Sequence, residues 1–244
     1  MRSWRDPRSP WGKQLRFDDH EFESMMDEIR GRTGDESFVP GKGVDVELVL
    51  LRAIGAEADY VDLPTNVLGR TIFSEDGSVK IEVSRLLSDA AEVDSLARRR
   101  FRTTLAHECG HVVCHQSLFI QDTESLSLFS ASQVAARPVM RQPIMCRSEG
   151  ICGAGYGGEW WEFQANRCMA ALLLPRRLVG DSVRLRLAGG GFKTGEDCIH
   201  GGHGQLLIEQ IADEYDVSQT ATLYRLQALG FIPTGAQTQM RLID

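Results

Sequence analysis

Long apolar runs are absent from this sequence: the longest covers only residues 169–174, far too few to cross a bilayer. The N-terminal segment carries charges and prolines but no apolar core of the kind found in a secretory signal. Cysteine is also scarce, and 6 cysteines among 244 residues suit a reducing compartment better than a disulfide scaffold. We therefore expect a soluble, cytoplasmic protein with no membrane partner.

Positive charge is in deficit, with 27 Lys and Arg residues against 34 Asp and Glu and a net charge of −7. This balance argues against nucleic acid as a general partner. One local exception is a basic patch that directly precedes the main motif and contains Arg98, Arg99, Arg100 and Arg102. With 42% apolar and 25% charged residues, the composition is otherwise that of a globular protein with one substantial core.

Hydrophobic periodicity and turn residues predict an α+β fold, in which a small three-stranded, partly antiparallel sheet packs on helices. The last two expected strands flank a tight-turn sequence and should form a hairpin. The expected strands are 58–63, Val67–Phe73 and Val79–Ser84. The expected helices follow Asp18 or Asp19, follow Asp45 as far as Gly55, and then cover about 95–116, 158–174, 176–188, 205–215 and 218–229.

The segment His107-Glu108-Cys109-Gly110-His111 contains the pattern H-E-x-x-H within the expected helix 95–116. Residues four apart lie one turn apart on the same helix face, so both imidazoles can reach one metal ion. Glu108 sits beside the pair, where it can act on a water molecule without being a ligand. Zinc in a hydrolase needs a third protein ligand and one open position.

His115 does not complete this site, since it lies eight residues beyond His107, which is roughly 12 Å of helix rise. A third histidine at the metzincin spacing would fall on position 117, which is Ser117. The third ligand must therefore come from another element of the chain.

Glu162 is the better candidate, because it opens the helix 158–174 and has Asn166 four residues further on the same face. A carboxylate ligand with a hydrogen-bonding partner one turn later is a sensible arrangement for a metal site. Glu159, one turn earlier, is a weaker alternative.

These residues resemble those of the ImmA/IrrE-type metallo-endopeptidases. The most specific pieces are the H-E-x-G-H helix followed by a histidine and the segment EFQANRCMAALLLP. The resemblance also covers GVDVELVLLRAIGAEADYVDLP and the late segment IADEYDVSQTATLYRLQALGF. It departs from the family at Gln164, where members often carry an acidic residue, and in the length of the insert between His111 and Glu162.

The resemblance implies a zincin-like core in which His107, His111 and Glu162 hold Zn²⁺, with Mn²⁺ or another divalent ion as a cellular substitute, and Glu108 is the catalytic base. Together with the composition of the chain, it divides the sequence into a polar tail at 1–17, a metallopeptidase domain at 18–188 with a long loop insert at 117–157, a Gly-rich linker at 189–204 and a helical pair at 205–232. The expected activity is endopeptidase cleavage of a regulatory protein such as a transcriptional repressor, in a stress response.

Two other sites can be weighed from the residues. The segment around Asp213 to Ser218, followed by Arg225, reads like a helix-turn-helix. Its first helix is acidic and its second has Arg225 as the only basic residue, so we expect the pair to pack on the core without binding nucleic acid. A second, structural zinc site is the less favoured interpretation of a group of loop residues. That group consists of Cys146, Cys152, Cys198, His200 and His203.

The main rival function is a DNA-binding regulator or a sensor whose metal site is structural and supports no turnover. Glu108 argues against both, since a structural site closes its fourth position and has no use for a carboxylate that is not a ligand. For the peptidase, we expect the substrate to bind as an extended strand along Val79–Ser84, provided that this strand is the sheet edge beside the metal. The insert 117–157 would then supply selectivity.

Overall fold

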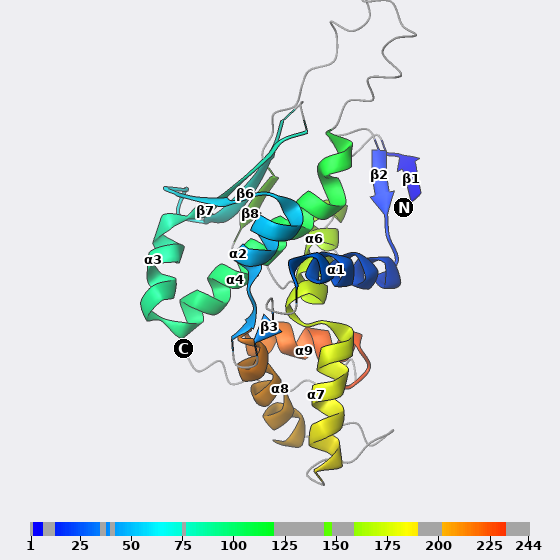
Figure 1. The fold of residues 1–244 in the computed structure, drawn as a ribbon. Coiled ribbons are helices and arrows are strands. Elements are labelled where there is room, and N and C mark those ends of the chain that lie inside the picture. Colours follow the sequence, from blue (N-terminus) through cyan, green and yellow to red (C-terminus); the bar gives the residue numbers. More distant parts are fainter. Residues whose placement is uncertain are drawn as a thin grey trace, which may run out of the picture.

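The structure is a computed structural model, and it describes residues 2–6, 13–34, 38–39, 42–74, 77–119, 144–147, 159–189 and 202–232. It confirms the predicted α+β class (Figure 1). The helices are α1 (Asp19–Thr33), α2 (Val46–Val49) continuing into the π-helical turn η2 (Leu50–Ile54), α3 (Arg85–Val93), α4 (Ser95–His115) with the 3₁₀ turn η3 (Gln116–Leu118), α6 (Trp160–Leu173), α7 (Arg176–Ala188), α8 (Gly202–Tyr215) and α9 (Gln219–Ala228). The strands are β1 (Arg2–Arg5), β2 (Lys13–Arg16), β3 (Phe38–Val39), β4 (Gly43–Val44), β5 (Ala58–Val61), β6 (Val67–Phe73), β7 (Val79–Ser84) and β8 (Ile144–Arg147).

The main sheet has the strand order β5-β7-β6-β8. Strands β6 and β7 pair antiparallel, as the hairpin prediction requires, and β5 pairs parallel to β7. The fourth strand, β8, pairs antiparallel to β6 and comes from the insert 117–157, so the expectation of three strands was wrong. The sequence around β8 lacks the alternation of apolar and polar residues that would predict a strand.

Strand β7 is interior, and the expectation that Val79–Ser84 forms the sheet edge was therefore wrong. Its backbone groups are shared between β5 on one side and β6 on the other. Ile81 and Val83 are completely buried, as suits a strand flanked on both sides. The sequence predicts three neighbouring strands but not the side of β7 on which β5 adds.

The described part of the predicted polar tail 1–17 contains two strands. Strands β1 and β2 form an antiparallel hairpin in which Arg2 pairs with Arg16 and Arg5 with Lys13. Leu15 is buried within it. Each of the two strands has only one apolar residue among polar ones, which gives no periodic signal. For this reason the strand pair is not evident in the sequence.

Helix α4 carries the metal motif through the middle of the molecule. Asp94 caps it, its side chain accepting hydrogen bonds from the Leu96 and Ala97 amides at 3.3 and 2.8 Å. The main sheet packs on one side of α4 and α6 on another, as Figure 1 shows. Every residue from Thr103 to Val112 is buried. The metal motif therefore faces other elements of the protein and not open solvent.

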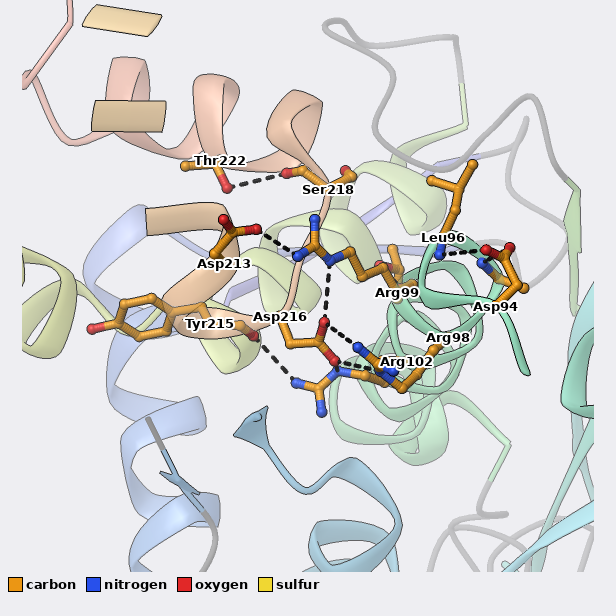
Figure 2. A network of polar contacts seen from close by, with 12 residues as sticks. Asp94, Leu96, Arg98, Arg99, Arg102, Asp213, Tyr215, Asp216, Ser218 and Thr222 are labelled. Atoms are coloured by element: carbon orange, nitrogen blue, oxygen red, sulfur yellow. Dashed lines mark hydrogen bonds and ion pairs between the residues drawn. The ribbon is translucent and has the colours of Figure 1, made fainter. Parts of the chain in front are cut away.

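Ion pairs join the C-terminal helices α8 and α9 to the core. Asp216 lies at the turn between them in a left-handed backbone conformation with φ 49°. Its carboxylate forms ion pairs with three arginines of α4, at 2.9 Å from Arg98, 3.1 Å from Arg99 and 3.7 Å from Arg102 (Figure 2). Arg99 also pairs with Asp213 at 2.7 Å. Three members of the basic patch therefore bind the chain's own carboxylates.

Arg225 on α9 is buried in the same interface between the helical pair and the core. Its Nε donates to the Leu174 carbonyl at 2.8 Å, and its guanidinium pairs with Glu23 of α1 at 2.7 Å. The helical pair thus packs on the rest of the protein, as we expected. Among the described residues, no helix is both long and apolar enough to cross a membrane.

Candidate metal centre

Helices α4 and α6 bring three potential metal ligands together. Within the described residues, His107, His111 and Glu162 are the one group of His, Cys, Asp and Glu side chains whose ligand atoms all lie within 4.8 Å of one another. The two histidine Nε2 atoms are 3.0 Å apart. The Glu162 carboxylate lies 3.0 Å from His107 Nε2 and 3.3 Å from His111 Nε2. The helical spacing of four residues aligns the imidazoles, and α6 supplies the third side chain.

A close helix contact makes this convergence possible. A side chain on Gly110 would place its Cβ 2.8 Å from the Ala165 carbonyl oxygen, 3.0 Å from the Ala165 Cα and 3.0 Å from the Cys168 Cβ. Real Cβ atoms do not approach so closely, so α4 and α6 can touch only because residue 110 is glycine. Glu162 lies one turn before Ala165 on α6 and reaches the imidazoles through this contact.

The alternative ligands occupy other positions. Glu159 is the exposed N-cap residue of α6 and is not part of the cluster. His115 also lies outside the cluster, as the helix rise predicts. Of the candidates weighed in the sequence, the structure therefore brings Glu162 to the two histidines.

Asn166 contacts a histidine of the cluster. Its Oδ1 lies 3.0 Å from His107 Nδ1, within hydrogen-bonding distance. The amide oxygen can accept the proton on Nδ1, which leaves the lone pair of Nε2 directed at the cluster. The helical spacing predicts that Asn166 lies near the cluster, but it does not predict the contact with His107.

The second imidazole has a longer chain of partners that the sequence did not reveal. His111 Nδ1 lies 3.2 Å from His115 Nδ1, and His115 Nε2 lies 3.1 Å from Gln164 Oε1. Gln164 Nε2 in turn donates to the Leu15 carbonyl of β2 at 2.7 Å. The clue in the sequence was the third histidine one turn after the motif, but no pattern connects it with residue 15.

Glu108 lies on the side of α4 that faces the sheet and is fully buried. Thr71 of β6 donates its hydroxyl to Glu108 Oε2 at 2.5 Å. Gly69 of β6 leaves room for the carboxylate, since a Cβ at this position would lie 2.8 Å from Glu108 Oε1. Strand β6 therefore fixes a carboxylate that is next to a cluster histidine in sequence but outside the cluster.

The site favours an ionised carboxylate and neutral imidazoles. Burial raises the pKa of Glu162, but its close polar contacts with His107 and His111 outweigh burial and lower the pKa below its ordinary value. Burial is the main cause that lowers the pKa of His111, and it lowers the pKa of His115 much further. Neutral imidazole and ionised carboxylate are the states in which these groups bind metals.

Three cysteines among the described residues, Cys109, Cys114 and Cys168, are buried free thiols. The Sγ atoms of Cys114 of α4 and Cys168 of α6 lie 3.2 Å apart, a pairing that sequence spacing did not predict. The residues of the suggested second zinc site fall outside the described residues or have side chains that the structure does not describe. They are Cys146, Cys152, Cys198, His200 and His203.

Comparison of the chain with models of known protein families gives no match, and comparison with curated proteins gives none either. The function must therefore be argued from the chemistry of the site.

Proposed function

We propose that this chain is a zinc-type, metal-dependent endopeptidase of the ImmA/IrrE kind that acts in the cytoplasm. The proposal depends above all on one observation. Three metal donors form a cluster, and the residue that follows one of them in the chain, Glu108, is a buried carboxylate that is bound by Thr71 and is not one of the clustered donors. Three protein ligands leave a position open, as in catalytic zinc sites, whereas structural sites use four.

The residues present fit a zinc ion. Two imidazoles direct Nε2 at a shared point, Glu162 is an ionised oxygen donor, and the Nδ1 atom of each imidazole has a hydrogen-bonding partner. A zinc ion held by His107, His111 and Glu162 would supply Lewis acidity toward the scissile carbonyl and make water reactive at neutral pH.

The chain's own residues would then move the proton. Glu108 accepts a proton from the attacking water and passes it to the nitrogen of the leaving amine. Thr71 and the main chain at Gly69 hold the carboxylate in one orientation during both transfers. Burial of Glu108 and the histidines keeps bulk water away from these charges and strengthens their interactions.

We propose that the substrate is a flexible segment of a regulatory protein, with a transcriptional repressor as the first candidate. An extended peptide fits because β8 is the outermost strand next to β6 in the described sheet, and β6 is the strand that contacts Glu108. The repressor follows from the family resemblance alone.

The rival function, DNA binding around a structural metal, receives little support from the contacts. Arg98, Arg99 and Arg102 pair with Asp216, and Arg225 is buried against Glu23. Cations committed to internal partners contribute little to phosphate binding.

The deciding experiment compares the zinc-loaded protein with its Glu108→Gln variant. Each is incubated with a repressor encoded beside it and with unfolded casein, and the cut sites are mapped by mass spectrometry. We expect one cut in an exposed repressor segment, intact casein, and no cut by the variant at unchanged zinc content. Cleavage by the variant, or no cleavage of any repressor by the wild type, would refute the proposal.

A further inference from the structure

The hydrogen-bond chain behind His111 has only one consistent arrangement of protons, which can be worked out from its far end. The Leu15 carbonyl can only accept, so Gln164 must present its N–H group there, as the 2.7 Å bond from Nε2 records. The other side-chain atom of Gln164, Oε1, can only accept and faces His115 Nε2 at 3.1 Å. His115 must therefore carry its proton on Nε2.

The same logic passes through the second imidazole. A neutral histidine has one N–H, so His115 Nδ1 is left with a lone pair. His111 Nδ1 lies 3.2 Å from it, and this contact is a hydrogen bond only if His111 carries its own proton on Nδ1. The remaining nitrogen of His111, Nε2, then presents its lone pair to His107 and Glu162, which is the form that binds a metal.

We propose that the main-chain carbonyl of Leu15, acting through Gln164 and His115, sets the metal-binding tautomer of His111. The N-terminal hairpin β1–β2 is then a working part of the metal centre, and Gln164 and His115 are positioning residues. This inference rests on the metal site of the proposed function but not on the peptidase activity.

Burial makes the arrangement effective. Leu15 is 2% exposed, Gln164 5%, and both His111 and His115 are fully buried. Water therefore cannot replace a missing partner along the chain, and the alternative tautomer of His111 would place two N–H groups or two lone pairs against each other. Leaving a buried polar group unpaired is costly enough to bias a tautomeric equilibrium strongly.

Substitution of Gln164 is the most direct way to change the order of donors and acceptors in these hydrogen bonds. Glutamate has the shape of glutamine but, when ionised, only acceptor atoms, so Gln164→Glu sets an oxygen against the Leu15 carbonyl. Gln164→Met keeps the length and removes both hydrogen bonds. Asn166→Leu is the matched control, because it removes the partner of His107 Nδ1 from the same face of the same helix.

The test measures tautomers and zinc affinity in the full-length chain. Long-range ¹H–¹⁵N NMR of the zinc-free protein should show His111 protonated on Nδ1, and competition with a chelator gives the zinc dissociation constant. We expect both Gln164 variants to lose the uniform Nδ1–H signal of His111 and to bind zinc about 10- to 100-fold more weakly. Asn166→Leu should change the His107 signal and leave that of His111 intact.

A purely structural role for Gln164 would lower the melting temperature but leave the tautomer of His111 unchanged, and that result would overturn the proposal. So would a wild-type spectrum with the His111 proton on Nε2, which decides the matter even if both variants fail to fold. Neither measurement involves cleavage. A protein that shows the predicted tautomer and zinc affinities but cuts no substrate would refute the proposed peptidase function alone.

Discussion

The main chain of Gly110 on α4 lies against the main chain of Ala165 on α6, so closely that a Cβ at position 110 would be 2.8 Å from the Ala165 carbonyl oxygen. This contact sets the separation of the two helices that carry the metal cluster. Glycine weakens an isolated helix by about 1 kcal/mol relative to alanine, so its presence inside α4 has to be explained by packing.

We expect Gly110→Ala to destabilise the protein and to weaken zinc binding, because the added methyl group forces α4 and α6 apart. Overpacking of this kind costs about 1–3 kcal/mol, more than the gain in helix propensity. Gly180→Ala on α7 is the control, since a Cβ there meets nothing closer than 3.8 Å. Urea unfolding should show a stabilised Gly180→Ala protein, and equal effects of the two changes would disprove the packing argument.

Replacing Glu162 by Ala should sharply lower zinc affinity, because it removes the carboxylate from the cluster of donors. The change Glu159→Ala removes an exposed carboxylate one turn earlier and should leave the affinity unchanged. Chelator competition measures both. The reverse result would move the third ligand to Glu159.

Thr71→Val tests how far Glu108 depends on β6. Valine keeps the buried shape but removes the hydroxyl that donates to Glu108 at 2.5 Å. A hydrogen bond to a charged group contributes about 1.5–3 kcal/mol, so we expect kcat/KM to fall by about 10- to 100-fold at unchanged zinc content.

Thr222→Val is the matched control for this change. Thr222 is also fully buried, but its hydroxyl donates to the Ser218 carbonyl at the start of α9. We expect a small loss of stability and full activity. If Thr222→Val slowed cleavage as much as Thr71→Val does, the effect of Thr71 would be one of general stability and not of Glu108.

Asp216→Asn should destabilise the protein by about 1–3 kcal/mol at neutral pH, because it removes the buried carboxylate that pairs with Arg98, Arg99 and Arg102. Asparagine tolerates the positive φ of this position, so the backbone is not the cause. Asp213→Asn is the control, since the Asp213 side chain is 74% exposed and its ion pair contributes little.

The effect of Asp216→Asn should also depend on pH in a defined direction. Burial opposes ionisation of Asp216, but hydrogen bonds from Arg98 and Arg99 outweigh burial and lower its pKa in the folded chain. The stabilisation is therefore complete above the pKa of the unfolded chain, about 3.9, and is lost as the pH falls through the folded pKa. Urea unfolding at pH 7 and pH 3 should show a smaller difference between wild type and variant at pH 3.

The sequence predicts most of the elements of this fold and the donors of the cluster, because both depend on local spacing. Strands β6 and β7 and the helix that carries His107 and His111 follow from periods of two and of about four residues. The contacts that support the donors depend on tertiary structure. Nothing local links Leu15 to Gln164 or Thr71 to Glu108, and the place of β7 in the sheet depends on β5 and β8.

The interface made by Arg225 and Asp216 has a consequence for how the chain can be divided. A chain shortened at residue 188 would leave the arginines of α4 without Asp216 and Glu23 without Arg225. Helices α8 and α9 are therefore not an independent domain, although the Gly-rich sequence 189–204 predicts a linker before them. Gene rearrangements that keep the H-E-x-x-H segment intact should carry α8 and α9 along with it, as one inherited unit.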